Sequence, residues 1–377
     1  MKNITKQIIK FLLLSVFATS TFAAAIHDAT KQDDVSTVQK LLAAKIAVDS
    51  VDEKGWTALH FAAEHNALKV AKLLIEKHAD VNAITSNVYS TPLNFAATHG
   101  YDEMVELLIA NKALVNKGDD GGWNPLHFAV YGNHISTVKI LFSHKANPDP
   151  QVQNLKTPLH KATFKNYTAI VKILLANNAN VNARDENNMT PLHQTATQGN
   201  NESVKILLAN KADINAIDNY DRSPLHYAAL GGQDETIKLL LANKADINAM
   251  RSGTTPVLNL AVANNHLKVV TLLLKNKVNI QAVDYTGKTA LHVASARAQI
   301  EIVTLLLDKK MQVNAKDNYG RTPLHIAAMM GREDVIKALL QHNADTQLTD
   351  KNKQTAAQLA SARNHKTIMA MLSGKTK

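Results

Sequence analysis

The chain of 377 residues carries 42 Lys and Arg against 32 Asp and Glu, a formal net charge of +10, and it contains no cysteine. Apolar residues make up 45% and charged residues 20%, which is typical of a globular protein and excludes a disordered one. The absence of cysteine excludes disulfide bonds, thiolate zinc sites and lipid attachment at an N-terminal cysteine.

Residues 1–23 have the three parts of a secretory signal peptide. Three lysines precede an apolar stretch from Phe11 to Ala18, and small residues occupy the −3 and −1 positions of a cleavage site ending at Ala23. Counted generously the apolar run is about 16 residues, shorter than the roughly 20 that span a bilayer. We expect cleavage after Ala23 or Ala25, with an uncleaved anchor as the alternative. Loss of the three lysines would change the charge from +10 to +7, and no later stretch is apolar for long enough to span a membrane.

A tetrapeptide of the type Thr-Pro-Leu-His recurs along the rest of the chain, first after 34 residues and then after every 33. A fixed period of this length indicates a linear array of repeats, each of which buries its apolar face only by stacking on its neighbours. The copies begin at Thr57, Thr91, Asn124, Thr157, Thr190, Ser223, Pro256 (displaced), Thr289, Thr322 and Thr355.

The copy at Thr190 shows how one repeat folds. Thr190 is a good helix N-cap, and Pro191 fits the first helical position, where its missing N–H costs nothing. Gly199 ends this short helix, and apolar spacing predicts a second helix from Glu202 to about Asn210. The Asp- and Asn-rich segment 218–221 then favours a turn. Each repeat is therefore a helix, a tight turn, a second helix and a hairpin-like loop.

This pattern resembles the ankyrin repeat family, whose hallmarks are Thr-Pro-Leu-His-x-Ala and a later Val-Asn-Ala segment such as that at 181–183. The resemblance implies an all-α solenoid of about eleven helix–turn–helix repeats, with hairpin tips and first helices on the concave side and second helices on the convex side. The expected domains are a signal peptide at 1–23, an N-terminal capping repeat at 24–56, nine repeats at 57–354, and a C-terminal capping helix pair with a tail at 355–377.

Three places interrupt the regular pattern. The loop at 84–90 carries one extra residue, the loop at 147–150 contains two prolines, and the motif at Thr255-Pro256 comes one residue early. By the 33-residue count, Val257 then takes the proline slot and Asn259 the histidine slot. The interruptions are either drift, which an array tolerates, or, at the last two of them, points at which the array flexes.

A fourth departure is systematic and concerns the residue just past each second helix. Ankyrin repeats usually have Gly there, because the backbone turns left-handed. A Lys in that conformation loses on the order of 1 kcal/mol, although its charge suits the helix C-terminus. The slot holds Lys45, His78, Lys112, Lys145, Asn178, Lys211, Lys244, Lys277, Lys310 and Asn343.

Eight histidines occupy the fourth motif position and invite a metal hypothesis. Neighbouring ones would lie about one layer, near 10 Å, apart. Two zinc ligands, each about 2.1 Å from the metal, cannot be much more than 4 Å apart. We therefore interpret these histidines as structural. They are His27, His60, His127, His160, His193, His226, His292 and His325.

The sequence contains no nucleophile elbow, complete phosphate-binding loop or metalloprotease signature. We therefore expect no enzymatic activity, no cofactor, no metal and no small-molecule substrate.

The positions that ankyrin proteins generally use for binding are the hairpin tips and the end of each first helix. Here these slots are rich in aromatic residues and arginine, which protein interfaces favour. The alternative is that the tip aromatics only pack on the next loop. We predict partner binding by Trp56, Tyr89, Trp123, Tyr131, Phe164, Met189, Tyr220, Arg222, Tyr285, Lys288, Tyr319 and Arg321, and the same slots also hold Glu64, Lys156, Lys165, Arg297, Met329 and Arg363.

On the opposite side, lysines recur at one second-helix slot: Lys72, Lys139, Lys172, Lys205, Lys238 and Lys337. They form either a solvated face or a surface for an anionic polymer or envelope.

The sequence thus predicts an exported, monomeric, non-catalytic protein that binds a protein partner, with neither nucleic acid nor a membrane span expected in the mature chain. Its short leader and residue usage suggest a Gram-negative bacterium and a periplasmic or secreted location. Release into a host cell as an effector, and binding of an anionic polymer, are the alternatives. Only polymer binding should weaken steeply with salt.

Overall fold

The computed structural model describes residues 24–250, 253 and 255–373, which fall into two compact units divided after Glu186. The expected signal peptide at 1–23 and the last four residues of the expected tail lie outside the described residues.

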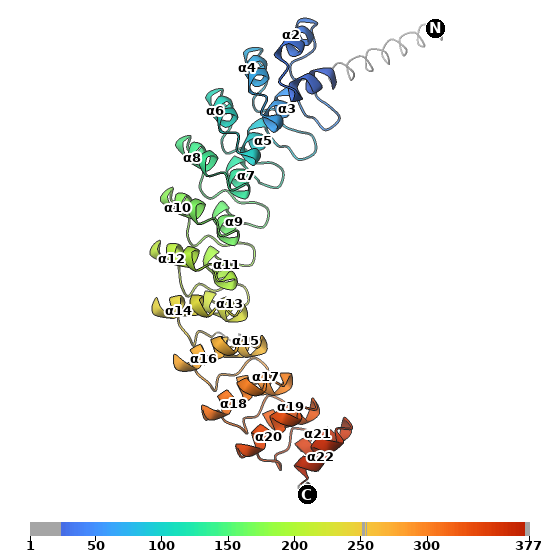
Figure 1. Ribbon diagram of the computed structural model, residues 1–377, viewed down its shortest axis with the longest axis vertical. Helices are drawn as coiled ribbons and strands as arrows, with labels where there is room; N and C mark the ends of the chain where they lie inside the picture. Colours follow the sequence, from blue (N-terminus) through green and yellow to red (C-terminus); the bar gives the residue numbers. More distant parts are fainter. Residues whose placement is uncertain (1–23, 251–252, 254, 374–377) are drawn as a thin grey trace, which may run out of the picture. The chain divides into compact units, whose positions relative to one another are not determined.

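Both units consist of pairs of short helices joined by a tight turn (Figure 1). In the first unit, a helical segment at 24–31 pairs with α2 (Val35–Ala43), α3 (Ala58–His65) with α4 (Leu68–Glu76), α5 (Pro92–His99) with α6 (Asp102–Ala110), α7 (Pro125–Tyr131) with α8 (Ile135–Ser143), and α9 (Pro158–Phe164) with α10 (Thr168–Ala176). In the second, α11 (Pro191–Gln198) pairs with α12 (Asn201–Ala209), α13 (Pro224–Leu230) with α14 (Asp234–Ala242), α15 (Val257–Ala263) with α16 (Leu267–Lys275), α17 (Ala290–Arg297) with α18 (Ile300–Asp308), α19 (Pro323–Met329) with α20 (Glu333–Gln341), and α21 (Ala356–Ala362) with α22 (Lys366–Leu372).

Within each unit, first helices pack on the first helices of neighbouring pairs, and second helices pack on second helices. The described residues contain no β-strand, only the isolated bridges Val51–Thr57 and Thr349–Thr355. The predicted all-α repeat architecture is therefore confirmed.

The local signals act as the sequence predicts. Thr190 is the N-cap of α11 in an extended conformation, Pro191 is its first residue, and Gly199 closes it with φ 74°. The second helix begins at Asn201, one residue before the predicted start. The core between the paired helices is apolar, with Leu192 and Leu207 fully buried. Truncating one such leucine to alanine would cost about 2–5 kcal/mol.

The slot just past the second helix is left-handed in all ten repeats from α2 to α20. All ten residues that the sequence places there, eight of them Lys or His and two Asn, have φ between 59° and 70°. The prediction of a left-handed cap filled by a residue other than glycine is confirmed.

The asparagine of the Val-Asn-Ala segment links successive repeats. Its side-chain oxygen accepts the backbone N–H of a residue about 31 positions later, at 2.8 Å from Leu114 to Asn82 and 3.0 Å from Asp246 to Asn215. In the proline-containing loop the Asp149 carboxylate takes over this role and accepts the Asn180 N–H at 2.8 Å. That interruption therefore keeps the hydrogen bond between repeats.

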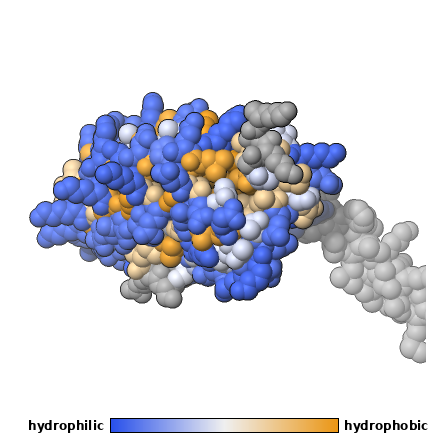
Figure 2. All heavy atoms as spheres, turned by 90° about the horizontal axis from the view of Figure 1, so that it is seen from below, coloured by the Kyte–Doolittle hydropathy of each residue, from blue (hydrophilic) through white to orange (hydrophobic). Residues whose placement is uncertain are grey.

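At the end of the chain, the helix pair α21 and α22 presents a polar outer surface. Gln358, Lys366 and Thr367 are exposed, and the view of the molecule from this end shows a largely hydrophilic surface with apolar atoms between (Figure 2).

Candidate functional site

The motif histidines hold the repeats together. Nδ1 of His60 accepts the Thr57 N–H at 3.1 Å, so its Nε2 carries the proton and donates to the Ser90 carbonyl of the next loop, also at 3.1 Å. Burial lowers the pKa of His60 to about 4, which keeps the ring neutral. His292 and His325 make the same contact to the next loop, with the carbonyls of Arg321 and Gln354. With both ring nitrogens used in this way, these side chains have a structural role.

Two motif histidines lack the second contact, and each precedes an interruption in the pattern. Nε2 of His127 and of His226 is buried without a hydrogen-bond partner. The loop after His127 contains the two prolines. Burial lowers the pKa of His127, and the Lys156 carbonyl of this loop raises it by a smaller amount. The loop after His226 leads into the displaced motif at Thr255-Pro256. The proline-containing loop and the displaced motif therefore each follow a motif histidine that lacks its hydrogen bond to the next loop.

The displaced motif also changes its own helix. Helix α15 has Pro256 as its N-cap and no side-chain cap. Asn259 stands in the histidine slot and donates from Nδ2 to the Lys288 carbonyl at 2.9 Å, while its own side-chain oxygen is buried and unpartnered. The slot assignment from the 33-residue count is thus confirmed at Asn259.

A second series of contacts between repeats was not predicted. The residue just before several second helices donates a side-chain N–H to a carbonyl near the end of the preceding first helix. These bonds are His134 to Thr98, Gln233 to Thr197, His266 to Leu230, Arg332 to Ala296 and His365 to Met329, at 2.9–3.3 Å. The signal in the sequence was the 33-residue recurrence of a long polar donor at that slot.

We call the surface formed by the hairpin tips and first helices the loop–first-helix face. One of its predicted binding residues, Trp56, is half-buried and lies in a cluster of aromatic rings. Its ring centroid lies 4.4 Å from that of Phe95 and 5.1 Å from that of Phe61, and its Nε1 is buried without a partner. A role in packing accounts for these contacts.

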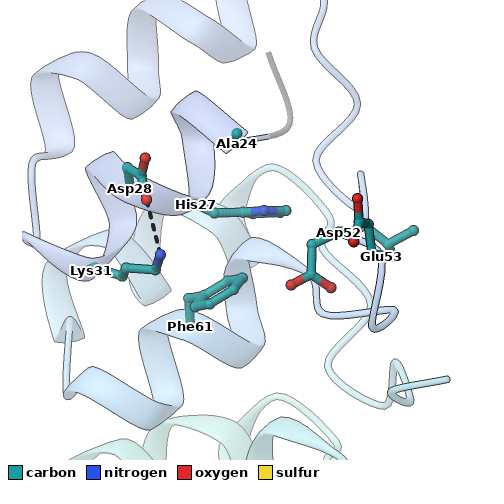
Figure 3. A pocket seen from close by; sticks show the side chains of 8 residues that line it. Ala24, His27, Asp28, Lys31, Asp52, Glu53 and Phe61 are labelled. Atoms are coloured by element: carbon teal, nitrogen blue, oxygen red, sulfur yellow. Dashed lines mark hydrogen bonds and ion pairs between the residues drawn. The ribbon is translucent and has the colours of Figure 1, made fainter. Parts of the chain in front are cut away.

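Beside this ring cluster lies a pocket of about 510 Å³ near the start of the described chain. Figure 3 shows the His27 ring next to Phe61, whose centroids are 4.8 Å apart, with Asp52 and Glu53 on the opposite wall. Lys31, the lining lysine, pairs with Asp28 at 2.9 Å. The pocket is therefore aromatic and carries more negative than positive charge.

Farther along the first unit, Trp123 and Tyr131 form an aromatic platform with a lysine on it. Their ring centroids are 5.8 Å apart, and Lys161 Nζ lies 4.3 Å from the Tyr131 centroid and 5.9 Å from that of Trp123. Burial, with the charges of Lys165 and Lys156, lowers the pKa of Lys161. Cation–π contacts of this kind contribute about 0.5–2 kcal/mol. The structure therefore brings two predicted residues together and adds Lys161, which the sequence reasoning had not selected.

In the second unit, two hairpin tips combine a tyrosine with an arginine. The Arg321 guanidinium lies 4.4 Å from the Tyr319 ring centroid and bonds the Asp317 carboxylate at 2.8 Å. Burial would raise the pKa of Asp317, but the hydrogen bonds from Arg321 hold it below its ordinary value. Arg222 lies 5.4 Å from the Tyr220 ring in the same way. These tips are held in place before any partner arrives.

The exposed aromatic residues occupy two kinds of position within the repeat. Within the described residues, every aromatic side chain that is exposed lies at a hairpin tip or at the last residue of a first helix. Their exposed fractions run from 49% to 72%, whereas the predicted residues Trp56, Trp123 and Met189 are half-buried. The exposed residues are Tyr89, Tyr131, Phe164, Tyr220, Tyr285 and Tyr319.

The recurring lysines of the second helices are partly neutralised. Lys205, Lys238 and Lys337 each pair with a carboxylate three residues earlier, at 4.0, 2.5 and 3.2 Å. Exposed pairs of this kind contribute little stability, but they reduce the net positive charge of this face.

In the part that the structure describes, no helix has both the length and the apolar character to cross a bilayer. Within the same residues, no three His, Asp or Glu side chains come together as a metal site would need.

Comparison with known proteins gives matches over nearly the whole chain. A family model described as ankyrin repeats (3 copies) matches residues 2–85, 83–154, 159–251, 218–284, 258–350 and 312–376. The crystal structure of the human ASB11 ankyrin repeat domain superposes with a TM-score of 0.54 at 26% identity, covering 59% of this chain and 99% of that one.

Similar sequences occur in proteins of several kinds. An ankyrin repeat protein of Rickettsia felis is 38% identical over 25% of this chain, and palmitoyltransferase AKR1 of Lachancea kluyveri is 33% identical over 26%. The human transient receptor potential cation channel subfamily A member 1 is 32% identical over 26%. The matched segments span only 39%, 14% and 9% of these three relatives.

Proposed function

Because this chain belongs to the ankyrin repeat family, we propose that it binds another protein through its loop–first-helix face and does so without catalysis. The location of the exposed aromatic residues supports this proposal most directly. In each unit, large exposed aromatic side chains lie on the loop–first-helix face, where contact with a partner would remove their apolar surface from water at about 25 cal/mol per Å².

The aromatic platform of Trp123 and Tyr131 is the best place to test binding. We expect Tyr131→Ala to weaken partner capture by about 1–3 kcal/mol, the range of a true interface anchor. Its side chain is half exposed, so its removal should leave helicity and the unfolding midpoint nearly unchanged. Trp56→Ala is the matched control, because that ring is enclosed and its loss should lower stability first.

The measurement is a crosslinking pull-down from fractionated cells, with circular dichroism on each variant. Normal capture by Tyr131→Ala, Trp123→Ala and Phe164→Ala together would remove this face of the first unit as the binding site. Capture lost only in parallel with helicity would mean that these rings serve packing.

We further propose that the protein acts outside the cytoplasm, in the periplasm or after secretion. The three-part N-terminus at 1–23 supports export. Mass spectrometry of the exported chain should find a start at Ala24 or Ile26, and a full-length, membrane-embedded chain as the single species would contradict export. Binding of an anionic polymer is disfavoured by the carboxylates that pair with Lys205, Lys238 and Lys337.

A further inference from the structure

On the loop–first-helix face of the second unit, α17 forms the floor of a continuous groove. Two adjoining hollows of about 370 and 740 Å³ share Ala296, Arg297 and Met330 among their lining residues. The first reaches the hairpin tip at Lys288, and the second reaches the turn at Arg332. The groove therefore follows α17 from its beginning to its end.

The charge of this groove is strongly one-sided. Four cationic side chains line it, namely Lys288, Arg297, Arg321 and Arg332, against one carboxylate, Asp284. Asp284 is already occupied, because its Oδ1 accepts the backbone N–H groups of Thr286 and Lys288.

Two of the four cations are free for a partner. Arg321 pairs with Asp317, and Nε of Arg332 donates to the Ala296 carbonyl. Lys288 Nζ and the Arg297 guanidinium, by contrast, form no ion pair within residues 24–250, 253 and 255–373. Arg297 is exposed and lines both hollows.

Between these charges the groove is apolar and adaptable. Met329 and Met330 lie along it with Val293 and Ala296. Unbranched methionine side chains adjust to different apolar shapes, which suits contact with a peptide side chain. The groove thus offers an apolar centre with an unpaired cation at either end of α17.

Building on the proposed function, we propose that this groove binds an acidic, extended segment of the partner protein, in which an apolar residue lies between two carboxylates. Helix α17 has 8 residues and is therefore about 12 Å long, which about four residues of an extended peptide cover. One carboxylate meets Lys288, the apolar side chain contacts the methionines, and the second carboxylate meets Arg297, which can bind it through two N–H groups.

The test uses a fluorescein-labelled peptide of about twelve residues that repeats Glu-Leu-Ala-Glu, with its Gln-Leu-Ala-Gln counterpart as the neutral probe. Fluorescence anisotropy of the full chain should show at least about tenfold tighter binding of the acidic peptide at low salt. Lys288→Glu combined with Arg297→Glu should weaken that binding about tenfold or more. Arg297→Gln alone, which adds no repulsion, should weaken it less.

The matched control is Lys244→Glu with Lys277→Glu, which makes the same change in net charge at exposed slots past second helices, outside the groove. This control should bind the acidic peptide like the unaltered chain, and equal loss in both double variants would mean that only net charge matters. The proposal also fails if the acidic peptide does not bind, if its neutral counterpart binds equally well, or if the groove variant binds normally.

The partner pull-down separates this inference from the proposed function. If the partner is captured normally by the Lys288→Glu and Arg297→Glu double variant but is lost with Tyr131→Ala, protein binding stands and the acidic-segment groove is wrong. If all variants and the unaltered chain capture nothing, the proposed function itself fails.

Discussion

Acid should destabilise this protein through its buried motif histidines. Burial lowers the pKa of His60, His127 and His226 to about 4, from an ordinary value near 6.5. Between pH 6.5 and pH 4 these histidines are protonated in the unfolded chain and remain neutral in the folded chain. Stability is therefore complete above about pH 6.5 and falls as the pH decreases toward 4.

The magnitude follows from the size of the pKa shift. At 1.36 kcal/mol per pH unit, one such histidine should remove about 2 kcal/mol of stability between pH 7.5 and 5.0. Three of them together should remove about 6 kcal/mol, which is comparable to the whole stability of many domains.

His60→Gln tests the reasoning, because the chain itself contains a glutamine in this slot. The Gln358 side-chain oxygen accepts the Thr355 N–H at 2.8 Å, as Nδ1 of His60 does with Thr57. The variant should keep the helix cap and lose about 2 kcal/mol less than the unaltered chain on going from pH 7.5 to 5.0.

Urea unfolding followed by circular dichroism at the two pH values measures this difference. Because a repeat array can open in parts, amide exchange of residues 57–90 should be followed alongside. His65→Gln, an exposed histidine outside the motif slot, is the control and should leave the pH dependence unchanged. If His60→Gln loses as much stability as the unaltered chain, the buried histidine is not the acid-sensitive group.

Two further predictions concern the backbone and the interruptions. Lys244→Gly should raise stability by about 1 kcal/mol, because Lys244 has φ 67°. Asn343→Gly should raise stability clearly less, because asparagine tolerates the left-handed conformation. Equal unfolding midpoints for the unaltered chain and both variants would contradict this prediction. Pro256→Thr combined with Val257→Pro and Asn259→His should give α15 a side-chain cap contributing about 1 kcal/mol. Amide exchange should then show increased protection around residues 255–263, which is expected to be low in the unaltered chain; unchanged protection would identify the displaced motif as silent drift.

Much of the fold could be predicted from the sequence because repeat proteins depend on local signals. The N-cap at Thr190, the proline after it and the glycine at Gly199 each act within one turn of helix, so their effect does not depend on distant residues. The left-handed slot could be located for the same reason. The predicted binding slots also lie on the surface that the fold exposes, but their roles could not be ranked from the sequence.

What the sequence alone determined is the period, the helix pairs and the apolar faces that must stack, since these follow from residue types at fixed spacing. Only the tertiary structure decided which aromatic side chains are exposed to solvent and which are packed against other rings. It encloses Trp56 against Phe95 and leaves Tyr131 exposed beside Lys161, and both contacts join residues that are 30 or more positions apart in the sequence. Burial and charge pairing depend on what the neighbouring repeat places opposite a side chain, and that neighbour is known only once the repeats are stacked.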